Sequence, residues 1–391
     1  MSKKNLTAVE LFSGIGGFRV AADELGIKTL LANDINPLSC SVYKSRFGTD
    51  AFVEGDVRTL ISQIPEHDIL TAGFPCQPFS AAGKKEGTRD PRGTLFETIV
   101  DVVALRRPQF FVLENVKRLL SMEHGEHFAT VLSALAELDY FIEWRVLNAK
   151  HFGLAQNRER VVIVGTRLPK PIPADADVLH LTRLATIREI TQTFHKPIRV
   201  LNKITNWRSL TKHGTKFPNW GMAYKGSFIA HDIFSFLEAK PQTLLREVLE
   251  KSPPGEYDMT EATIHRLGDN EVVDKYVNGV EIISNQSGGA RMGYTIFGVG
   301  GLAPTLTAST SRHYERYFIE DRYRRLTPIE YARLQGFPDF HCATVSPYDQ
   351  YSLLGNAVPP PMVKWVLEKL LEEREPQELP LYEHQQDLFY V

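Results

Sequence analysis

Short apolar runs, each followed by a turn and half of them by a helical pattern, recur through the first 165 residues of the sequence. Runs of this kind are typical of strands buried on both faces of a sheet. We predict strands at residues 8–12, 29–32, 52–56, 68–72, 110–113 and 161–165, and helices at residues 18–25, 95–105 and 128–138. Strands that alternate with helices predict an α/β fold with a doubly wound, mostly parallel sheet.

Polar side chains stand just beyond the predicted carboxyl ends of these strands. The carboxyl ends of parallel strands share one edge of the sheet, where open α/β folds bind their ligands. Two blander interpretations stay open: Asp34 as a helix cap before Pro37, and Glu114 as a solvated strand end. The residues that we expect to converge on this edge are Ser13, Asp34, Asp56, Cys76 and Glu114.

A glycine-rich turn, Ser13-Gly14-Ile15-Gly16-Gly17, joins the first predicted strand to the first helix. Glycines let a backbone approach a ligand closely, and the start of a helix favours polar or anionic groups. The turn therefore resembles the beginning of a nucleotide-binding unit, although its spacing differs from the dinucleotide pattern G-x-G-x-x-G. Glycine turns also serve plain connections between a strand and a helix.

Cys76 lies in the turn Gly73-Phe74-Pro75-Cys76-Gln77-Pro78-Phe79-Ser80. The two prolines fix the backbone on either side of the cysteine, directly after a predicted buried strand. Such a cysteine is either a positioned nucleophile or an inert packing residue. The chain has three cysteines in all, widely spaced, which predicts neither a disulfide framework nor a metal site and suits a reducing compartment.

The pattern changes after Arg167, where Pro169, Pro171 and Pro173 indicate a linker. Residues 180–220 hold eight Lys or Arg against one acid, and aromatic side chains are interleaved with them: Phe194, Trp207, Phe217 and Trp220. Residues 275–282 are typical of a hairpin around an Asn-Gly turn, and residues 284–311 are rich in Gly, Ser and Thr. We expect a smaller, irregular, β-rich domain that contacts phosphates and bases; a solvated face over an aromatic core is the alternative.

No apolar stretch approaches membrane-spanning length, and the first residues lack the pattern of a signal peptide. We therefore expect a cytoplasmic protein. Two further helices are predicted at residues 328–334 and 361–373, followed by an acidic tail.

Six blocks, in order along the chain, resemble DNA (cytosine-5)-methyltransferases of the compact bacterial restriction-modification type. They are Phe12-Ser13-Gly14-Ile15-Gly16-Gly17, Gly73-Phe74-Pro75-Cys76-Gln77, Glu114-Asn115-Val116, Gln156-Asn157-Arg158-Glu159-Arg160, a late block from Arg325 through Pro338, and Gly355-Asn356-Ala357-Val358. The resemblance implies the S-adenosylmethionine-dependent methyltransferase fold. It assigns residues 1–175, completed by 326–391, to the catalytic domain and residues 176–325 to a target-recognition domain.

The resemblance also implies a covalent mechanism on a flipped-out cytosine. Cys76 would add to C6, Glu114 would hydrogen-bond the ring, Arg160 would contact the ring carbonyl, and Arg158 would steady the phosphate or the nucleophile loop. The basic segment 81–93 would close over the base. The expected contacts of S-adenosyl-L-methionine are Phe12, Gly14, Ile15, Gly16, Gly17, Asp34, Ile35, Asp56, Val57, Pro75, Leu95, Asn356 and Ala357. The expected contacts of DNA are Ser80, Lys84, Arg92, Arg199, Lys203, Arg208, Thr305, Thr307, Arg312 and Arg316.

The implied partner is double-stranded DNA, read in a site that contains guanine, with a restriction endonuclease as functional counterpart. We expect a monomer that acts at the nucleoid and needs no metal. A transfer-RNA cytosine methyltransferase shares the same core, but the long segment between the catalytic halves favours DNA. A catalytically dead DNA-binding regulator is disfavoured by intact Cys76, Glu114 and Arg160, and a nicotinamide oxidoreductase by the glycine spacing.

Overall fold

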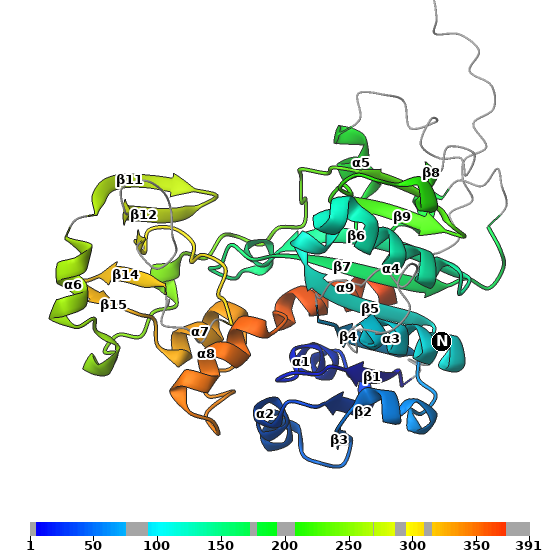
Figure 1. Cartoon of the computed structure of the whole chain (residues 1–391), viewed down its shortest axis with the longest axis horizontal. Helices are drawn as coiled ribbons and strands as arrows, with labels where there is room; N and C mark the ends of the chain where they lie inside the picture. Colours follow the sequence, from blue (N-terminus) through cyan, green and yellow to red (C-terminus); the bar gives the residue numbers. More distant parts are fainter. Residues whose placement is uncertain are drawn as a thin grey trace, which may run out of the picture.

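The computed structural model describes residues 5–75, 93–172, 178–193, 208–268, 270–285, 295–308 and 315–372. Within these residues the chain forms a ten-stranded sheet and a separate five-stranded sheet (Figure 1). The α/β class, with a second and smaller β-rich part, is therefore confirmed.

The larger sheet has two halves of different character. From β3 to β5 all neighbouring strands are parallel, whereas every pair from β5 to β8 is antiparallel. In spatial order the strands are β3 (Phe52–Glu54), β2 (Lys28–Asp34), β1 (Thr7–Leu11), β4 (Ile69–Gly73), β5 (Phe110–Val116), β7 (Glu159–Arg167), β6 (Tyr140–Asn148), β9 (Trp220–Tyr224), β10 (Ser227–His231) and β8 (Arg208–Ser209). Because β7 runs against β5, the beginning of β7 lies at the same edge as the end of β5.

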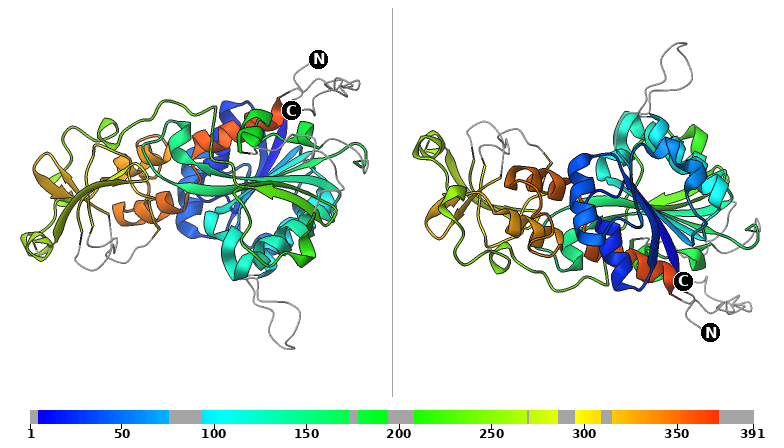
Figure 2. Two further views of the ribbon diagram at one scale, coloured as in Figure 1. Left: turned by 90° about the horizontal axis from the view of Figure 1, so that it is seen from above. Right: turned by 90° about the horizontal axis from the view of Figure 1, so that it is seen from below.

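Helices cover both faces of this sheet, as Figure 2 shows. One apolar cluster joins Phe96 and Val102 of α3 (Gly93–Arg106) and Leu132 of α4 (Glu126–Ala136) to one face. Another joins Phe18 of α1 (Gly17–Glu24) and Met362 of α9 (Pro360–Leu371) to the opposite face. The last described helix, α9, therefore lies on the same face of the sheet as α1, although more than 300 residues separate the two helices in the sequence.

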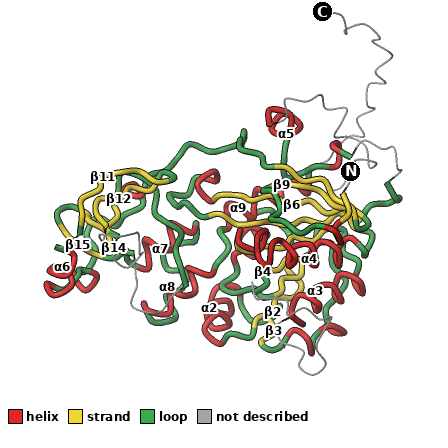
Figure 3. Tube along the Cα trace, turned by 45° about the horizontal axis from the view of Figure 1, so that its top comes forward, coloured by secondary structure: helices red, strands yellow, loops and turns green. Residues whose placement is uncertain are grey.

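The smaller sheet has the order β11 (Glu271–Val277), β12 (Val280–Asn285), β13 (Ile296–Phe297), β14 (Arg316–Ile319) and β15 (Arg322–Arg324). The expected hairpin is present: Asn278 and Gly279 both have positive φ, at 51° and 83°, as a two-residue turn of the I′ type requires. Figure 3 shows α7 (Pro328–Gln335) and α8 (Pro347–Asn356) between the two sheets. The other α-helices of the described residues are α2 (Pro37–Phe47), α5 (Ile187–Thr193) and α6 (Glu261–Leu267).

Several features were not expected from the sequence. β6, β9 and β10 were not predicted, and residues 208–231, which were assigned to target recognition, form three strands of the larger sheet. Of the two interpretations of the aromatic residues, base contact is wrong for Phe217 and Trp220 and burial in the core is confirmed, because both side chains are fully buried in apolar clusters. Phe194 and Trp207 lie outside the described residues.

Gly165 in β7 offers a test of this packing. A Cβ atom there would lie 2.0 Å from Cε1 of Phe111, whose ring is fully buried. Gly165→Ala should lower the free energy of unfolding by about 2 kcal/mol, the usual cost of overpacking a core. Urea denaturation measures this, with Gly214→Ala as control because nothing lies within 4 Å of a Cβ at Gly214. Equal stability of the two variants would contradict the described packing.

Candidate active site

The glycine turn between β1 and α1 is held closely on one side and open on the other. A Cβ at Gly16 would lie 2.3 Å from the Phe47 ring, and a Cβ at Gly17 would lie 2.4 Å from the carbonyl oxygen of Val358. Gly14 has φ +54°, a conformation that favours glycine, and nothing lies within 4 Å of a Cβ built there. The turn is therefore fixed against α2 and the start of α9, with open space beside Gly14 for a ligand.

Asp34, at the end of β2, supports this turn. Its Oδ2 accepts a hydrogen bond of 2.7 Å from the Gly14 amide, and its Oδ1 accepts one of 2.8 Å from the Asn36 amide. Each carboxylate oxygen has two lone pairs, so both oxygens keep acceptor capacity for a hydroxyl group. The neighbouring Ile35 is 64% exposed, which leaves an apolar surface beside the carboxylate.

The end of β3 lies next to β2, because the Asn33 side chain donates to the carbonyls of Val53 and Gly55. Asp56 follows there and accepts from Arg58, an ion pair that lowers the pKa of Asp56. Val57 is buried. This edge therefore presents two carboxylates, Asp34 and Asp56, on neighbouring strands.

Glu114 and Arg160 form an ion pair of 2.9 Å across β5 and β7, and each side chain is 12% exposed. Burial raises the pKa of Glu114, whereas the guanidinium groups of Arg160 and Arg158 oppose that shift. Burial likewise lowers the pKa of Arg160. The pair is thus largely desolvated, where hydrogen bonds to a bound polar ring would be strong.

The chain leaves β4 beside this pair. Gly73 is in register with Glu114, and the Asn115 side chain donates a hydrogen bond of 3.0 Å to the carbonyl of Phe74. Pro75 is the last described residue before the segment that contains Cys76. The structure therefore fixes the backbone that leads to the predicted nucleophile.

The side chains of the other two cysteines are buried, and their thiols have raised pKa values. Cys40 and Cys342 are 0% and 2% exposed, and burial raises their pKa values to about 11 and about 12. A thiolate, not a thiol, is the nucleophile. Neither residue is therefore suited to attack a substrate.

Arg158 is fully buried and its guanidinium donates to three carbonyl oxygens, those of Leu306, Gly355 and Ala357, at 3.0, 2.9 and 2.9 Å. Burial lowers its pKa to about 9. These contacts do not support the predicted role on a phosphate, because the side chain has no access to solvent. Arg158 is instead a positioning residue that joins the start of β7 to two distant segments.

Residues 303–308 lie along the start of β7. The Leu306 amide donates to Gln156 Oε1 at 3.1 Å, and Thr305 Oγ1 donates to the Asn157 carbonyl at 2.6 Å. Gln156 Nε2 in turn donates to the Leu334 carbonyl of α7 at 3.0 Å. Thr305 and Thr307 are half-buried here, close to the start of β7.

The structure brings together only part of the predicted site. Ile15 is buried, Phe12, Leu95 and Ala357 are half-buried, and Pro75 and Asn356 are exposed. Arg316 is half-buried at the start of β14. The predicted residues outside the described part of the chain are Cys76, Ser80, Lys84, Arg92, Arg199, Lys203 and Arg312.

Arg208 does not join this group. It is exposed on β8, the last strand of the larger sheet, four positions beyond β7. Strands in a sheet lie about 4.8 Å apart, so β8 is roughly 19 Å from β7. Figure 1 shows β8 at the end of the larger sheet that is remote from β11–β15.

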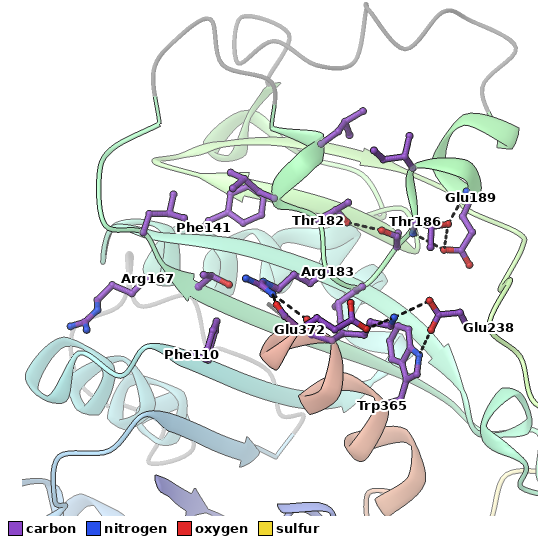
Figure 4. Close-up of a pocket in the computed structure, with 18 of the residues that line it drawn as sticks. Phe110, Phe141, Arg167, Thr182, Arg183, Thr186, Glu189, Glu238, Trp365 and Glu372 are labelled. Atoms are coloured by element: carbon purple, nitrogen blue, oxygen red, sulfur yellow. Dashed lines mark hydrogen bonds and ion pairs between the residues drawn. The ribbon is translucent and has the colours of Figure 1, made fainter. Parts of the chain in front are cut away.

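A cavity of about 960 Å³ lies at the opposite edge of the sheet, beside the first residue of β5, Phe110, and the last residue of β7, Arg167 (Figure 4). Some of its polar groups are engaged with one another: Glu238 accepts from Trp365 and pairs with Lys369. Glu114 and Arg160 lie at the other ends of these strands. This cavity is therefore not the site formed by the convergent residues.

Among the described residues, no group of three or more His, Cys, Asp or Glu side chains is arranged to hold a metal ion. None of the helices in the described ranges is both long enough and apolar enough to cross a membrane.

Comparisons with known proteins agree on one family. The family model described as C-5 cytosine-specific DNA methylase matches residues 6–372. The type II methyltransferase M1.ScrFI of Lactococcus lactis subsp. cremoris is 31% identical over 370 residues, 93% of this chain and 77% of that protein. The type II methyltransferase M.HpaII of Haemophilus parainfluenzae is 29% identical over 374 residues, 95% of this chain and 90% of that protein.

Solved structures show the same fold at lower sequence identity. The crystal structure of the S. pombe Dnmt2 methyltransferase superposes with a TM-score of 0.60 at 19% identity, covering 94% of this chain and 98% of that one. The crystal structure of a mutant of Spodoptera frugiperda DNMT2 gives a TM-score of 0.58 at 18% identity, covering 94% of this chain and all of that one.

The role of Arg158 can be tested by stability. Arg158→Met keeps an apolar stem of similar length but leaves three carbonyl oxygens without their donor, so the free energy of unfolding should fall by about 3 kcal/mol or more. Chemical denaturation measures this, and Arg167→Met, an exposed residue of the same strand, should have little effect. If the two variants were equally stable, Arg158 would not join these segments.

Proposed function

The chain belongs to the C-5 cytosine-specific DNA methylase family, and on that premise we propose that it methylates C5 of a flipped-out cytosine in double-stranded DNA through a covalent bond between Cys76 and C6 of the base. Membership of the family makes the protein a DNA (cytosine-5) methyltransferase. The observation that supports the proposed mechanism best is the desolvated Glu114–Arg160 pair beside the chain segment that leads to Cys76.

Cytosine C5 is a weak nucleophile, which explains the need for a thiolate. Addition of the Cys76 thiolate to C6 breaks the C5–C6 double bond and places negative charge on the N3–C2–O2 side of the ring. Glu114, in its protonated form, donates its O–H to N3 and accepts from the exocyclic amine with its other oxygen, and Arg160 donates to O2, so both stabilise this charge as it develops. C5 is then electron-rich and takes the methyl group. Loss of the C5 proton to a base and expulsion of the thiolate restore the aromatic ring and the free enzyme.

The residues at the glycine turn fit S-adenosyl-L-methionine. The open space beside Gly14, the remaining acceptor capacity of Asp34 and the exposed side chain of Ile35 suit a ribose next to an adenine ring. Asp56 and Val57, at the end of the neighbouring strand, would hold the adenine, and Pro75 and Leu95 the methionine part. When bound, S-adenosyl-L-methionine supplies the electrophilic methyl group on a sulfonium centre.

The surface that reads DNA is proposed to lie on the five-stranded sheet and on residues 303–316. Thr305 and Thr307 are candidates for backbone contacts, and Arg316 for a contact near them. Residues 208–231 share the larger sheet, so we restrict the target-recognition domain to the part of residues 176–325 that follows β10. A base inside a duplex is unreachable for Cys76, so the target cytosine must leave the stack.

The biological setting follows from the curated relatives. Their printed names are those of type II methyltransferases, and we infer that this protein also protects DNA against a partner restriction endonuclease. It would act as a monomer on DNA at the nucleoid of a bacterial cell. These assignments rest on the relatives and on the sequence.

Conversion-based sequencing tests the proposed reaction. Genomic DNA from a methylation-deficient bacterial host that expresses the protein should show protected cytosines in one short motif. Cys76→Ser should abolish the protection while cofactor binding persists, because different residues are assigned to the two tasks. Glu114→Gln should lower kcat about 100-fold or more, because an amide cannot transfer a proton to N3 as a carboxyl group can.

Protected cytosines at the wild-type level in the Cys76→Ser strain would contradict the covalent mechanism. A folded, cofactor-binding wild-type protein that protects no cytosine in DNA would contradict the substrate assignment, and RNA would then be assayed.

A further inference from the structure

Glu315 is a buried acid that the proposed chemistry does not use. It stands immediately before β14, is 2% exposed and accepts a hydrogen bond from the Tyr331 hydroxyl. Its other oxygen, Oε1, is buried without a hydrogen-bond partner. Burial raises the pKa of Glu315, while the Tyr331 hydroxyl and the backbone amides of Glu315 and Thr307 oppose that shift. A buried carboxyl group is costly unless it is hydrogen-bonded or paired, so the bond from Tyr331 stabilises Glu315 at this position.

The two ends of the chain on either side of residues 309–314 are attached to neighbouring helices. Thr307, before these residues, packs on Gly355 of α8, and Glu315, after them, accepts from Tyr331 of α7. Because α7 and α8 pack against each other, both ends are attached to one support. Thr305, Thr307 and Arg316, close to these ends in the sequence, are the described candidates for DNA contact.

The outgoing end of this segment is fixed independently. A Cβ at Gly355 would lie 2.4 Å from the Thr307 carbonyl oxygen, so the backbone there packs directly on the end of α8. The Ser352 hydroxyl donates to the Ala308 carbonyl at 3.4 Å. Leu306 is held by Gln156 and Arg158. A shift of residues 306–308 would therefore disturb the start of β7, the strand that carries Arg160.

Tyr331 gives the returning end a fixed point of attachment. It is 3% exposed on α7, and its ring packs edge-on against Tyr351 with the centroids 4.7 Å apart. The Leu334 carbonyl of the same helix accepts from Gln156, close to Arg158 in the sequence. The Tyr331 hydroxyl therefore stands in a fixed relation to the strand that carries Arg160.

We propose that Glu315 and Tyr331 are a positioning pair that holds the two ends of residues 307–315 together near β7, the strand that carries Arg160. The pair thereby sets how strictly the enzyme discriminates its DNA site from altered sites. This inference rests on the proposed function. The pair touches neither the cytosine nor the cofactor site, so its loss should change DNA binding and site discrimination and leave the chemical step intact.

The matched experiment compares two buried tyrosines that touch each other. Tyr331→Phe removes the hydroxyl that reaches Glu315, and Tyr351→Phe removes one that donates to the Leu326 carbonyl at 2.6 Å. Both full-length variants keep the ring pair, and both should melt at a lower temperature than the wild type. Steady-state methylation is then measured on duplexes with the site found by sequencing and with single base-pair changes in it.

Tyr331→Phe should raise KM for DNA about tenfold and lower the ratio of kcat/KM between correct and altered sites to a similar extent, as expected for loss of a hydrogen bond to a carboxylate. Its kcat at saturating DNA and its affinity for S-adenosyl-L-methionine should stay unchanged. Tyr351→Phe should leave KM for DNA and discrimination at the wild-type values.

Substitution of the acid separates positioning from general stability. Glu315→Gln keeps an oxygen that can accept from Tyr331 and should retain discrimination, whereas Glu315→Leu should behave as Tyr331→Phe does. Equal effects of Tyr331→Phe and Tyr351→Phe on discrimination, or no effect of either, would overturn this inference while the proposed function stands. A wild-type protein that methylates no DNA would overturn both.

Discussion

The ion pair between Glu114 and Arg160 is the interaction on which the proposed site depends. It joins the end of β5 to the beginning of β7 at 2.9 Å, in surroundings that leave each side chain 12% exposed. Removal of either partner would leave a buried, unpaired charge, which is far more costly than an exposed one. The antiparallel pairing of β5 with β7 is what makes this contact possible, because a parallel β7 would carry Arg160 to the opposite edge of the sheet. Glu114 and Arg160 therefore lie at the same edge of the sheet as the glycine turn.

Segments that lie far apart in the sequence are attached to these two strands. Asn115 beside Glu114 holds the chain that leads to Cys76, while Gln156, Asn157 and Arg158 hold residues 303–306 and the end of α8. The start of β7, which carries Arg160, is therefore also the support for the segment assigned to DNA reading. This arrangement explains why α7 and α8 lie between the two sheets: they supply the carbonyl groups and the helix end against which that segment and β7 pack. In the proposed enzyme, recognition and chemistry share one rigid support.

The sequence was sufficient to predict the parallel half of the sheet, because each of its strands is a short apolar run with a turn behind it. It also predicted the edge at which Asp34, Asp56 and Glu114 gather. β6 was missed because Glu143 and Arg145 interrupt its apolar pattern; these charges are buried and satisfied by distant groups, Trp220 Nε1 for Glu143 and Glu189 for Arg145. The burial of Trp220 was missed for the same reason, since its partner lies 77 residues away. The role of Arg158 could not be read from its motif, because its acceptors are backbone carbonyls whose identity depends on the tertiary fold.

The central claim is that Cys76 attacks C6 while Glu114 and Arg160 hold the ring. A duplex with 5-fluorocytosine at the methylated position tests it most directly, because the fluorine at C5 cannot leave as a proton does and the adduct cannot collapse. Mass spectrometry of the protein incubated with this duplex and S-adenosyl-L-methionine should show a covalent complex that carries one added methyl group, with the link on the peptide that contains Cys76. Methylation of the unmodified duplex with no covalent complex on the fluorinated one, or a link on Cys40 or Cys342, would contradict the account.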